Sequence, residues 1–373
     1  MNTILVFTTL LAALPRPPVQ EPVYNERTLS EWQAMLKSDP LPRKRRAAII
    51  ALGELAQTEK SATVPALVAV GAALRNDASP TVREQSAATL GLQKTEDALF
   101  ALDDLMAAMR QEREPKVRAA VALTLGRYGR AAKQAVGPLT EALSDADDFV
   151  IAASAEALGR IGGEAKSAAP KLLVLAKSET LNVRRFAVFA LGRIEPEDPV
   201  AAAAAIVRFL RRETMPALQR EAVIALGLLG ESGGEVLPAL AERFGETDTE
   251  LKLALLETIG KFGAAGKEIH SRIVPILTGD PNPSIRRQAV RTLGKCLMTD
   301  EAALIRIMSQ PLSTDTDFQV RVAIVEEFGA MRVDYKAAVP LLRQAQKDPQ
   351  IQVREAAGLA LKTLLKLDQS KKP

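Results

Sequence analysis

The sequence predicts an all-α fold, an α-solenoid of about ten helical hairpins. A ten-residue pattern recurs along the chain, for example as VREQSAATLG, VRAAVALTLG and VRRFAVFALG, and its closing glycines lie 33 to 38 residues apart. That period is the length of one helical hairpin, and a regular period of this size is the signature of a repeat array. Aromatic residues make up only 4% of the chain, and no long run alternates apolar and polar residues, so we expect no strands.

The repeats are numbered 1 to 10 by the residue that closes each copy of the pattern. These residues are Gly53, Gly91, Gly126, Gly159, Gly192, Gly227, Gly260, Gly294, Gly329 and, in the tenth copy, Lys362.

The chain begins with residues 1–22, a segment outside the repeats. Residues 4–14 are an apolar run that is too short to cross a bilayer but fits the core of a secretory signal. Residues 15–22 contain four prolines and predict an extended linker. No Lys or Arg precedes the run and no A-x-A site follows it, so a short buried or frayed segment is the alternative. We expect export to the periplasm or cell envelope if the segment is a signal peptide, and a cytoplasmic protein otherwise.

The second helix of each unit, helix B, is expected to begin near the Val-Arg pair of the pattern. In repeat 2, Val82, Ser86, Ala87 and Leu90 share one helical face and should point into the core. The closing glycine leaves room for a neighbouring helix. In four repeats another glycine follows three residues later and predicts a left-handed C-terminal cap. These glycines are Gly129, Gly162, Gly230 and Gly263.

The first helix of each unit, helix A, is expected to begin at a proline, which is tolerated in the first turn because amide groups there have no intrahelical partner. In repeat 2 this helix runs through Leu67, Val68 and Leu74 and ends in a polar turn at residues 76–80. Each unit is therefore an αα-hairpin. The prolines in question are Pro65, Pro138, Pro170, Pro238, Pro275 and Pro340.

An acidic residue precedes the basic position of helix B by six residues in almost every repeat. The basic position holds arginine in seven repeats, with Ile151, Gln219 and Lys252 as departures. The acid can accept hydrogen bonds from free amides at the start of helix B, and the arginine can reach the acid of a neighbouring turn. We expect a structural ladder along the stack. The residues six before the basic position are Asp39, Asp77, Glu112, Asp145, Ser178, Glu213, Glu246, Asp280, Asp315 and Asp348.

The hairpin of about 34 residues, the proline of helix A, the acid-to-arginine spacing and the V-R-x-x-A-A-x-x-L-G run resemble HEAT repeats. The units are similar in particular to the HEAT-like repeats of the phycobilisome-lyase type. The resemblance covers residues 28–367. It implies a right-handed superhelix whose B helices line the concave side, and it implies a scaffold, since the repeat residues themselves are structural.

Both ends of the array depart from the pattern. Thr28 and Glu31 form the sequence of a capping box, and Trp32, the single tryptophan, is expected to seal the open end of the stack. The last repeat replaces the closing glycine by Lys362, and residues 370–373 form a charged tail. The solenoid is therefore assigned to residues 23–369.

The chain offers little for chemistry. Its single histidine, His270, is expected in an exposed loop, and its single cysteine, Cys296, is expected to be buried near the end of a B helix. One cysteine cannot form a disulfide within the chain, and a Cys/His zinc cluster is excluded. The motifs G-x-x-x-x-G-K, G-x-S-x-G and H-E-x-x-H are absent. We expect no enzyme, no cofactor and no metal.

The exposed positions of helix B are expected one, two, five, six and nine residues after the basic position. The ninth position carries a row of cations that Leu228 interrupts in repeat 6. Repeat 5 adds Arg185, Phe186 and Phe189 at outward positions, and exposed aromatics among cations suit an interface. The alternative for the row is that cations favour the C-terminal end of any helix. The row consists of Arg127, Arg160, Arg193, Lys261 and Lys295.

The sequence therefore predicts a non-catalytic scaffold that acts as a monomer and binds a protein partner along the concave face around repeats 3 to 5. Its net charge is too small to indicate nucleic acid as the partner. The net charge is only +4, from 49 basic and 45 acidic residues. One alternative is a nucleic-acid binder that uses the basic row, which would show a steep salt dependence. Another is a lyase-like or chaperone subunit that acts on a cofactor-bearing protein, and this rests only on the resemblance.

Overall fold

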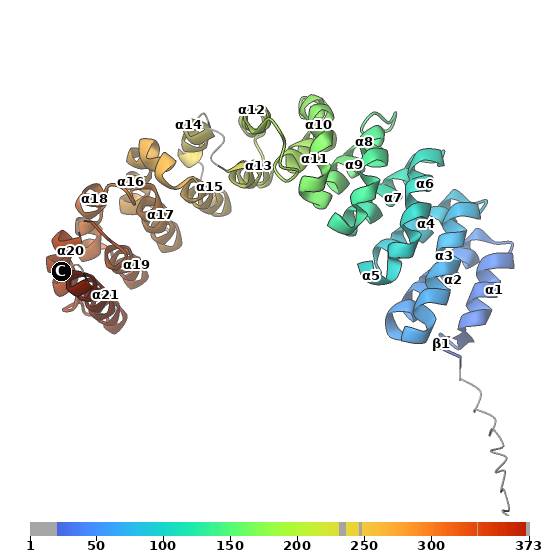
Figure 1. Cartoon of the computed structure of the whole chain (residues 1–373), viewed down its shortest axis with the longest axis horizontal. Coiled ribbons are helices and arrows are strands. Elements are labelled where there is room, and N and C mark those ends of the chain that lie inside the picture. The colour runs from blue at the N-terminus through green and yellow to red at the C-terminus, as the bar shows by residue number, and fades with distance from the viewer. Residues whose placement is uncertain (1–20, 231–235, 246–247, 334, 371–373) are drawn as a thin grey trace, which may run out of the picture. The chain divides into compact units, whose positions relative to one another are not determined.

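The computed structural model describes residues 21–230, 236–245, 248–333 and 335–370 (Figure 1). Over these ranges the chain forms ten consecutive helical hairpins, so the predicted all-α solenoid is confirmed. The apolar run at residues 4–14, most of the proline-rich linker and residues 371–373 of the tail lie outside the described residues.

The A helices form one series. They are α1 (Leu29–Ser38), α3 (Lys60–Asn76), α6 (Leu102–Gln111), α8 (Val136–Ala142), α10 (Ala169–Leu175), α12 (Pro199–Arg212), α14 (Val236–Ala241), α16 (His270–Gly279), α18 (Glu301–Thr314) and α20 (Tyr335–Ala345). Short helical segments adjoin several of them. These are α5 (Thr95–Ala98) and the 3-10 turns η1 (Leu99–Ala101), η2 (Gly129–Ala135), η3 (Gly162–Ala168), η4 (Glu242–Gly245) and η5 (Gly263–Ile269).

The B helices form the other series. They are α2 (Pro42–Thr58), α4 (Pro80–Gly91), α7 (Pro115–Arg127), α9 (Asp148–Ile161), α11 (Leu181–Leu191), α13 (Pro216–Leu229), α15 (Thr249–Lys261), α17 (Pro283–Cys296), α19 (Phe318–Gly329) and α21 (Ile351–Ser370).

The chain divides into two compact units, one up to Ala108 and one from Met109 onward. In the second unit each B helix from α7 to α21 packs against the next B helix, and α8 to α20 cover them as a second layer (Figure 1). In the first unit α2 packs against α3 and α4, and α1 packs against α2. Each hairpin therefore buries its apolar face against its neighbours, as expected for a repeat array.

Helices B pack through the closing glycine. A Cβ atom placed on Gly126 would lie 2.8 Å from Cα of Ala157, and one on Gly192 would lie 2.7 Å from Cα of Ala225. Ala157 and Ala225 occupy the sixth position after the basic position, which was predicted to be exposed. That prediction is wrong, because this small residue is buried against the glycine of the preceding repeat. The predicted inward face is confirmed, since Val82 and Leu90 are fully buried.

Helix boundaries differ from the expected ones in a regular way. Five B helices begin at a proline in the first position, three residues before the basic position in α4 (Pro80) and α7 (Pro115). Proline fits there because its missing amide has no intrahelical role. In contrast, α3, α16 and α20 begin five residues before their prolines. His270, expected in a loop, is the first residue of α16, and its Nδ1 lies 2.6 Å from the carbonyl oxygen of Lys267.

The four predicted cap glycines all have positive φ angles, between 53° and 81°. At Gly162 and Gly230, however, ψ is −144° and −155°, so these two residues are not in the left-handed helical region. Only glycine adopts that combination readily. At Gly162 it turns the chain directly from α9 into η3.

The expectation that the chain has no strands is wrong at the start of the solenoid, where a short β-hairpin lies. Strands β1 (Val23–Tyr24) and β2 (Arg27–Thr28) pair antiparallel through a two-residue turn, in which Asn25 and Glu26 have φ angles of 45° and 65°. Each strand has only two residues, which is too short to show an alternating apolar and polar pattern. The turn between them also takes only two residues, both with positive φ angles.

Trp32 is buried beneath this hairpin, and its indole N–H donates to the carbonyl oxygen of Tyr24 at 2.9 Å. The predicted capping box is confirmed, because the amide of Thr28 donates to the Glu31 carboxylate and the amide of Glu31 donates to the Thr28 hydroxyl. The hairpin and Trp32 together close the N-terminal end of the first unit, as expected for Trp32.

Candidate partner-binding surface

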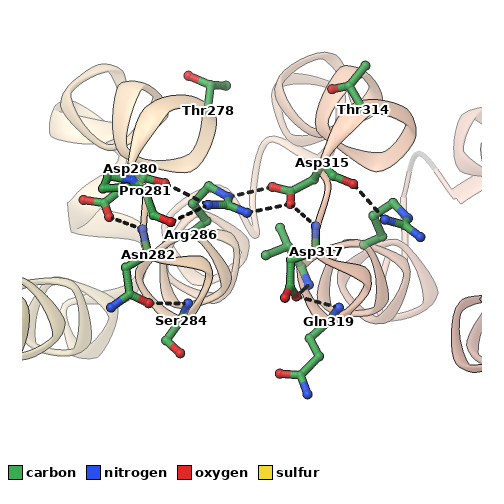
Figure 2. Close-up of polar contacts among 12 residues, drawn as sticks. Thr278, Asp280, Pro281, Asn282, Ser284, Arg286, Thr314, Asp315, Asp317 and Gln319 are labelled. Atoms are coloured by element: carbon green, nitrogen blue, oxygen red, sulfur yellow. Dashed lines mark hydrogen bonds and ion pairs between the residues drawn. The ribbon is translucent and has the colours of Figure 1, made fainter.

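The acid-to-arginine spacing produces a repeated ion pair at the junction of helices A and B (Figure 2). Nε and Nη2 of Arg286 each donate to the Asp315 carboxylate at 2.8 Å, and Nη1 donates to the carbonyl oxygen of Asp280 at 2.8 Å. Asp315 also accepts the amide of Asp317 at 2.9 Å, at the start of α19. The two side chains are 11% and 5% exposed. A guanidinium held in this way is fully engaged and is not available to a ligand.

The same pair recurs along both units and confirms the predicted ladder. In the last pair the hydrogen bond from Arg321 is the main cause that lowers the pKa of Asp348. Arginines of the ladder are therefore structural. The pairs are Arg45 with Asp77, Arg118 with Asp145, Arg184 with Glu213, Lys252 with Asp280, Arg286 with Asp315 and Arg321 with Asp348.

The predicted cationic row lies on the opposite part of the B helices, at their C-terminal ends. Arg127, Lys261 and Lys295 are exposed. Arg160 forms an ion pair with Glu156 of its own helix, with 2.5 Å between Nη2 and Oε1. The stems of three of these cations cover the glycine of the preceding repeat: a Cβ atom on Gly126, Gly227 or Gly260 would lie 3.5, 3.5 or 3.4 Å from Cδ of Arg160, Lys261 or Lys295. The contact with the preceding glycine therefore positions these side chains, and successive B helices place their cations side by side.

In repeat 5 the structure brings together the four residues singled out from the sequence. The rings of Phe186 and Phe189 meet edge to face, with centroids 6.3 Å apart. The guanidinium of Arg193 lies 3.8 Å from the Phe189 centroid, and that of Arg185 lies 5.1 Å from the Phe186 centroid. Partial burial lowers the pKa of Arg193, and Arg185 pairs with Glu221 at 2.7 Å. All four side chains are partly buried, less exposed than predicted, because the Phe189 ring fills the space over Gly159.

Sequence reasoning missed two apolar residues on the adjacent helix α13. Ile224 is 38% exposed and Leu228 is 49% exposed. They occupy the positions of Phe189 and Arg193 one repeat later, so register alone could have identified them. Leu228, first seen as an interruption of the row, extends an apolar surface. The α11–α13 patch is defined as Arg185, Phe186, Phe189, Arg193, Ile224 and Leu228.

The described residues contain no group of three His, Cys, Asp or Glu side chains placed to hold a metal ion. Burial raises the pKa of the Cys296 thiol to about 11, so at neutral pH this side chain is a packed thiol and not a nucleophile. Over the same residues, no helix combines the length and the apolar character required to cross a membrane.

A family model of HEAT repeats matches residues 102–180 and 169–260. No curated protein sequence matches the chain. Among solved structures, the crystal structure of an engineered protein is similar to this chain, with a TM-score of 0.59 over 90% of this chain and 98% of that one, at 17% sequence identity. At that identity the likeness shows the fold alone.

Proposed function

We propose that the chain is a non-catalytic scaffold that binds a protein partner on its B-helix layer, centred on the α11–α13 patch. The match of residues 102–180 and 169–260 to a family model of HEAT repeats supports this proposal. HEAT repeats generally mediate protein–protein interactions, which gives the broad class. The narrower assignment rests on one observation: partly exposed aromatic, aliphatic and cationic side chains occupy equivalent positions on two neighbouring, packed B helices.

The composition of the patch suits an interface. Aromatic residues and arginine are enriched at the centres of protein interfaces, where they supply most of the binding energy. Phe186 and Phe189 are held by stacking and by two guanidinium groups, so little side-chain entropy would be lost on binding. Arg160 and Lys261 flank the patch on the helices before and after it. The complementary partner is a segment with apolar anchors and acidic residues.

The test replaces the exposed aliphatic pair. Ile224→Ser with Leu228→Ser removes apolar surface without opening the core, because both side chains are more than one-third exposed. The control is Val174→Ser with Val200→Ser, which removes two exposed valines, 68% and 61% exposed, from A helices α10 and α12. Crosslinking and affinity capture from the source cells should recover a partner with the wild type and with the control, but not with the patch variant.

Equal recovery of that partner by both double variants would refute the patch as the site. A second variant, Arg185→Ala with Arg193→Ala, tests the cationic part, and we expect it to weaken capture in a salt-dependent way.

The cationic row also carries the alternative of nucleic-acid binding. In that case affinity would fall steeply with salt, roughly by one power of salt concentration for each phosphate contacted. A gel shift at two salt concentrations separates the two functions. We expect no specific shift, because Glu156 pairs with Arg160 within the row and Glu257 is exposed on α15 beside it.

A further inference from the structure

A polar groove, here called the first groove, lies on the A-helix side of the second unit, between α10 and α12. It has a volume of ≈ 370 Å³. Its walls carry four cations, of which Arg184 is the buried member of the ladder. The lining residues are Ala176, Lys177, Arg184, Arg208, Phe209 and Arg212.

An equivalent groove lies three repeats later, between α16 and α18. Every lining residue of the first groove has its counterpart in the second at a distance of 102 residues in sequence. Figure 2 shows Thr278 and Thr314 of this second groove on the two A helices beside Arg286 and Asp315. The counterparts, in the same order, are Thr278, Gly279, Arg286, Gln310, Pro311 and Thr314.

The two grooves share their backbone but differ in charge. Lys177, Arg208 and Arg212 stand where the second groove has glycine, glutamine and threonine. In addition, the turn beside the first groove has Ser178 where the second has Asp280, so a carboxylate is absent as well. The acid is absent together with its own partner, because Ile151 and Ser178 stand where Lys252 and Asp280 form an ion pair. Three cations are therefore gained at a site that the fold itself does not require to be basic.

Existing ion pairs neutralise only part of this charge. Arg184 is paired with Glu213 at 2.7 Å, and Arg212 with Glu179 at 2.6 Å, although the Glu179 side chain is 87% exposed. Lys177 and Arg208 form no ion pair with other described residues and are exposed. The groove therefore keeps about two uncompensated positive charges.

The helix dipole does not account for the cluster. Cations do favour the last turn of a helix, where Arg208 and Arg212 lie in or near the end of α12. The equivalent helix α18 ends without any basic residue, however, and Lys177 belongs to the turn after α10, on the other wall. The preference of cations for the end of one helix therefore cannot explain why cations of two different elements line the same groove.

We propose that the groove between α10 and α12 binds a phosphate group. In the other arginine–aspartate pairs of the second unit a single cation balances a single carboxylate, as in Arg118 with Asp145, Arg286 with Asp315 and Arg321 with Asp348. The first groove has more cations than one carboxylate balances: the guanidinium groups of Arg208 and Arg212, one helical turn apart, and the ammonium group of Lys177 on the other wall. These groups match the double negative charge and the tetrahedral acceptor oxygens of phosphate. The phosphate is either free or carried by a phosphorylated side chain of a partner. This site is separate from the α11–α13 patch and does not depend on it.

The first test titrates the full chain with inorganic phosphate by calorimetry at constant ionic strength, with chloride as the balancing anion. The variant Lys177→Gly, Arg208→Gln, Arg212→Thr carries the residues of the second groove, so its packing is already tolerated by this fold. We expect at least tenfold weaker phosphate binding, because several charge-assisted hydrogen bonds are lost. Binding of phosphate by the variant with wild-type affinity, or no binding by the wild type, would overturn the proposal.

The second test transfers the site. Adding Gly279→Lys, Gln310→Arg and Thr314→Arg to that variant should restore phosphate binding at the second groove, and Gly279 has room because a Cβ atom there would meet nothing within 4 Å. Failure of the transfer in a folded variant would count against a site made by these three cations.

A third variant, Ser178→Asp, restores the missing acid and should weaken phosphate binding. The local turn can accept it, since the Ser178 hydroxyl already accepts the Thr180 amide at 3.2 Å, as the Asp280 carboxylate accepts that of Asn282. Unchanged affinity in this variant would contradict the charge argument. A phosphoserine peptide and its aspartate counterpart then distinguish the sources: preference for the phosphopeptide over inorganic phosphate assigns a partner side chain, and the reverse assigns the free anion.

Discussion

Two junctions of the second unit show which interactions the solenoid requires. Between α17 and α19, Arg286 and Asp315 form a buried pair (Figure 2). Between α9 and α11 the equivalent positions are Ile151 and Ser178, and the pair is missing. The helices nevertheless pack there: a Cβ atom on Gly159 would lie 2.9 Å from Cα of Ala190. Glycine against a small residue is therefore enough to stack two hairpins, and the ion pair is an addition that becomes costly only when half of it is removed.

The largest effect is expected from breaking a complete pair. Asp315→Ala leaves the Arg286 guanidinium buried without its partner, which typically costs about 3–5 kcal/mol. Ser178→Ala at the other junction removes only the hydrogen bond to the Thr180 amide and should cost about 1 kcal/mol. Chemical denaturation, with hydrogen exchange to locate the loss, measures both.

A double variant tests whether the loss of stability comes from the charge left without a partner. Arg286→Met with Asp315→Leu removes both charges and makes the junction resemble the one at Ile151. Replacing both members of a buried pair by apolar residues is often nearly neutral, so most of the stability lost in Asp315→Ala should return. If Asp315→Ala costs no more than Ser178→Ala, the ladder has no energetic role.

A smaller effect on stability is expected at repeat 9, where a carboxyl group lies against the closing glycine of repeat 8. The sixth residue after the basic position is Ala or Thr in every repeat except repeat 9, where it is Glu327, which faces Gly294. Burial, with a contribution from Glu326, raises the pKa of Glu327 to about 7, against the opposing influence of Arg291 and Lys295 on α17. The carboxyl group is thus placed in a contact that favours its neutral form.

The sign of the pH dependence follows from that shift. Between about pH 4.5 and pH 7 the folded chain binds more protons at Glu327 than the unfolded chain does, so stability falls as pH rises through this window. Glu327→Gln should remove this contribution and stabilise the protein at pH 8 by about 1–2 kcal/mol, allowing for partial exposure. Denaturation at pH 5 and pH 8 measures it. An identical pH slope in the wild type and the variant would show that Glu327 ionises normally.

The sequence predicted the features that depend on spacing within one hairpin. The acid six residues before the arginine, the capping box at Thr28 and the inward face at Val82 are local patterns, and the structure confirms them. Features that depend on the neighbouring hairpin were harder to predict. The burial of Ala157 against Gly126 and the convergence of Lys177 with Arg208 both arise only when adjacent repeats are stacked. The signal for the groove was nevertheless present, since Ser178 is the single non-acidic residue among ten aligned positions.

The smallest effect is expected at Arg185, whose neighbour in sequence, Arg184, provides an internal control. Arg184 pairs with Glu213 and both side chains are at most 10% exposed, whereas Arg185 pairs with Glu221 and these are 35% and 34% exposed. Exposed pairs contribute about 0–1 kcal/mol because water and salt screen them. Arg185→Ala should therefore change the free energy of unfolding by less than about 1 kcal/mol, while Arg184→Ala should cost several times more by leaving Glu213 buried and unpaired. Denaturation of the two single variants in parallel makes the measurement, and raising the salt concentration should shrink only the Arg185 effect. A loss of stability at Arg185 as large as that at Arg184 would mean that this side chain holds the helices together, and the proposed division between structural arginines of the ladder and binding arginines of the α11–α13 patch would fail.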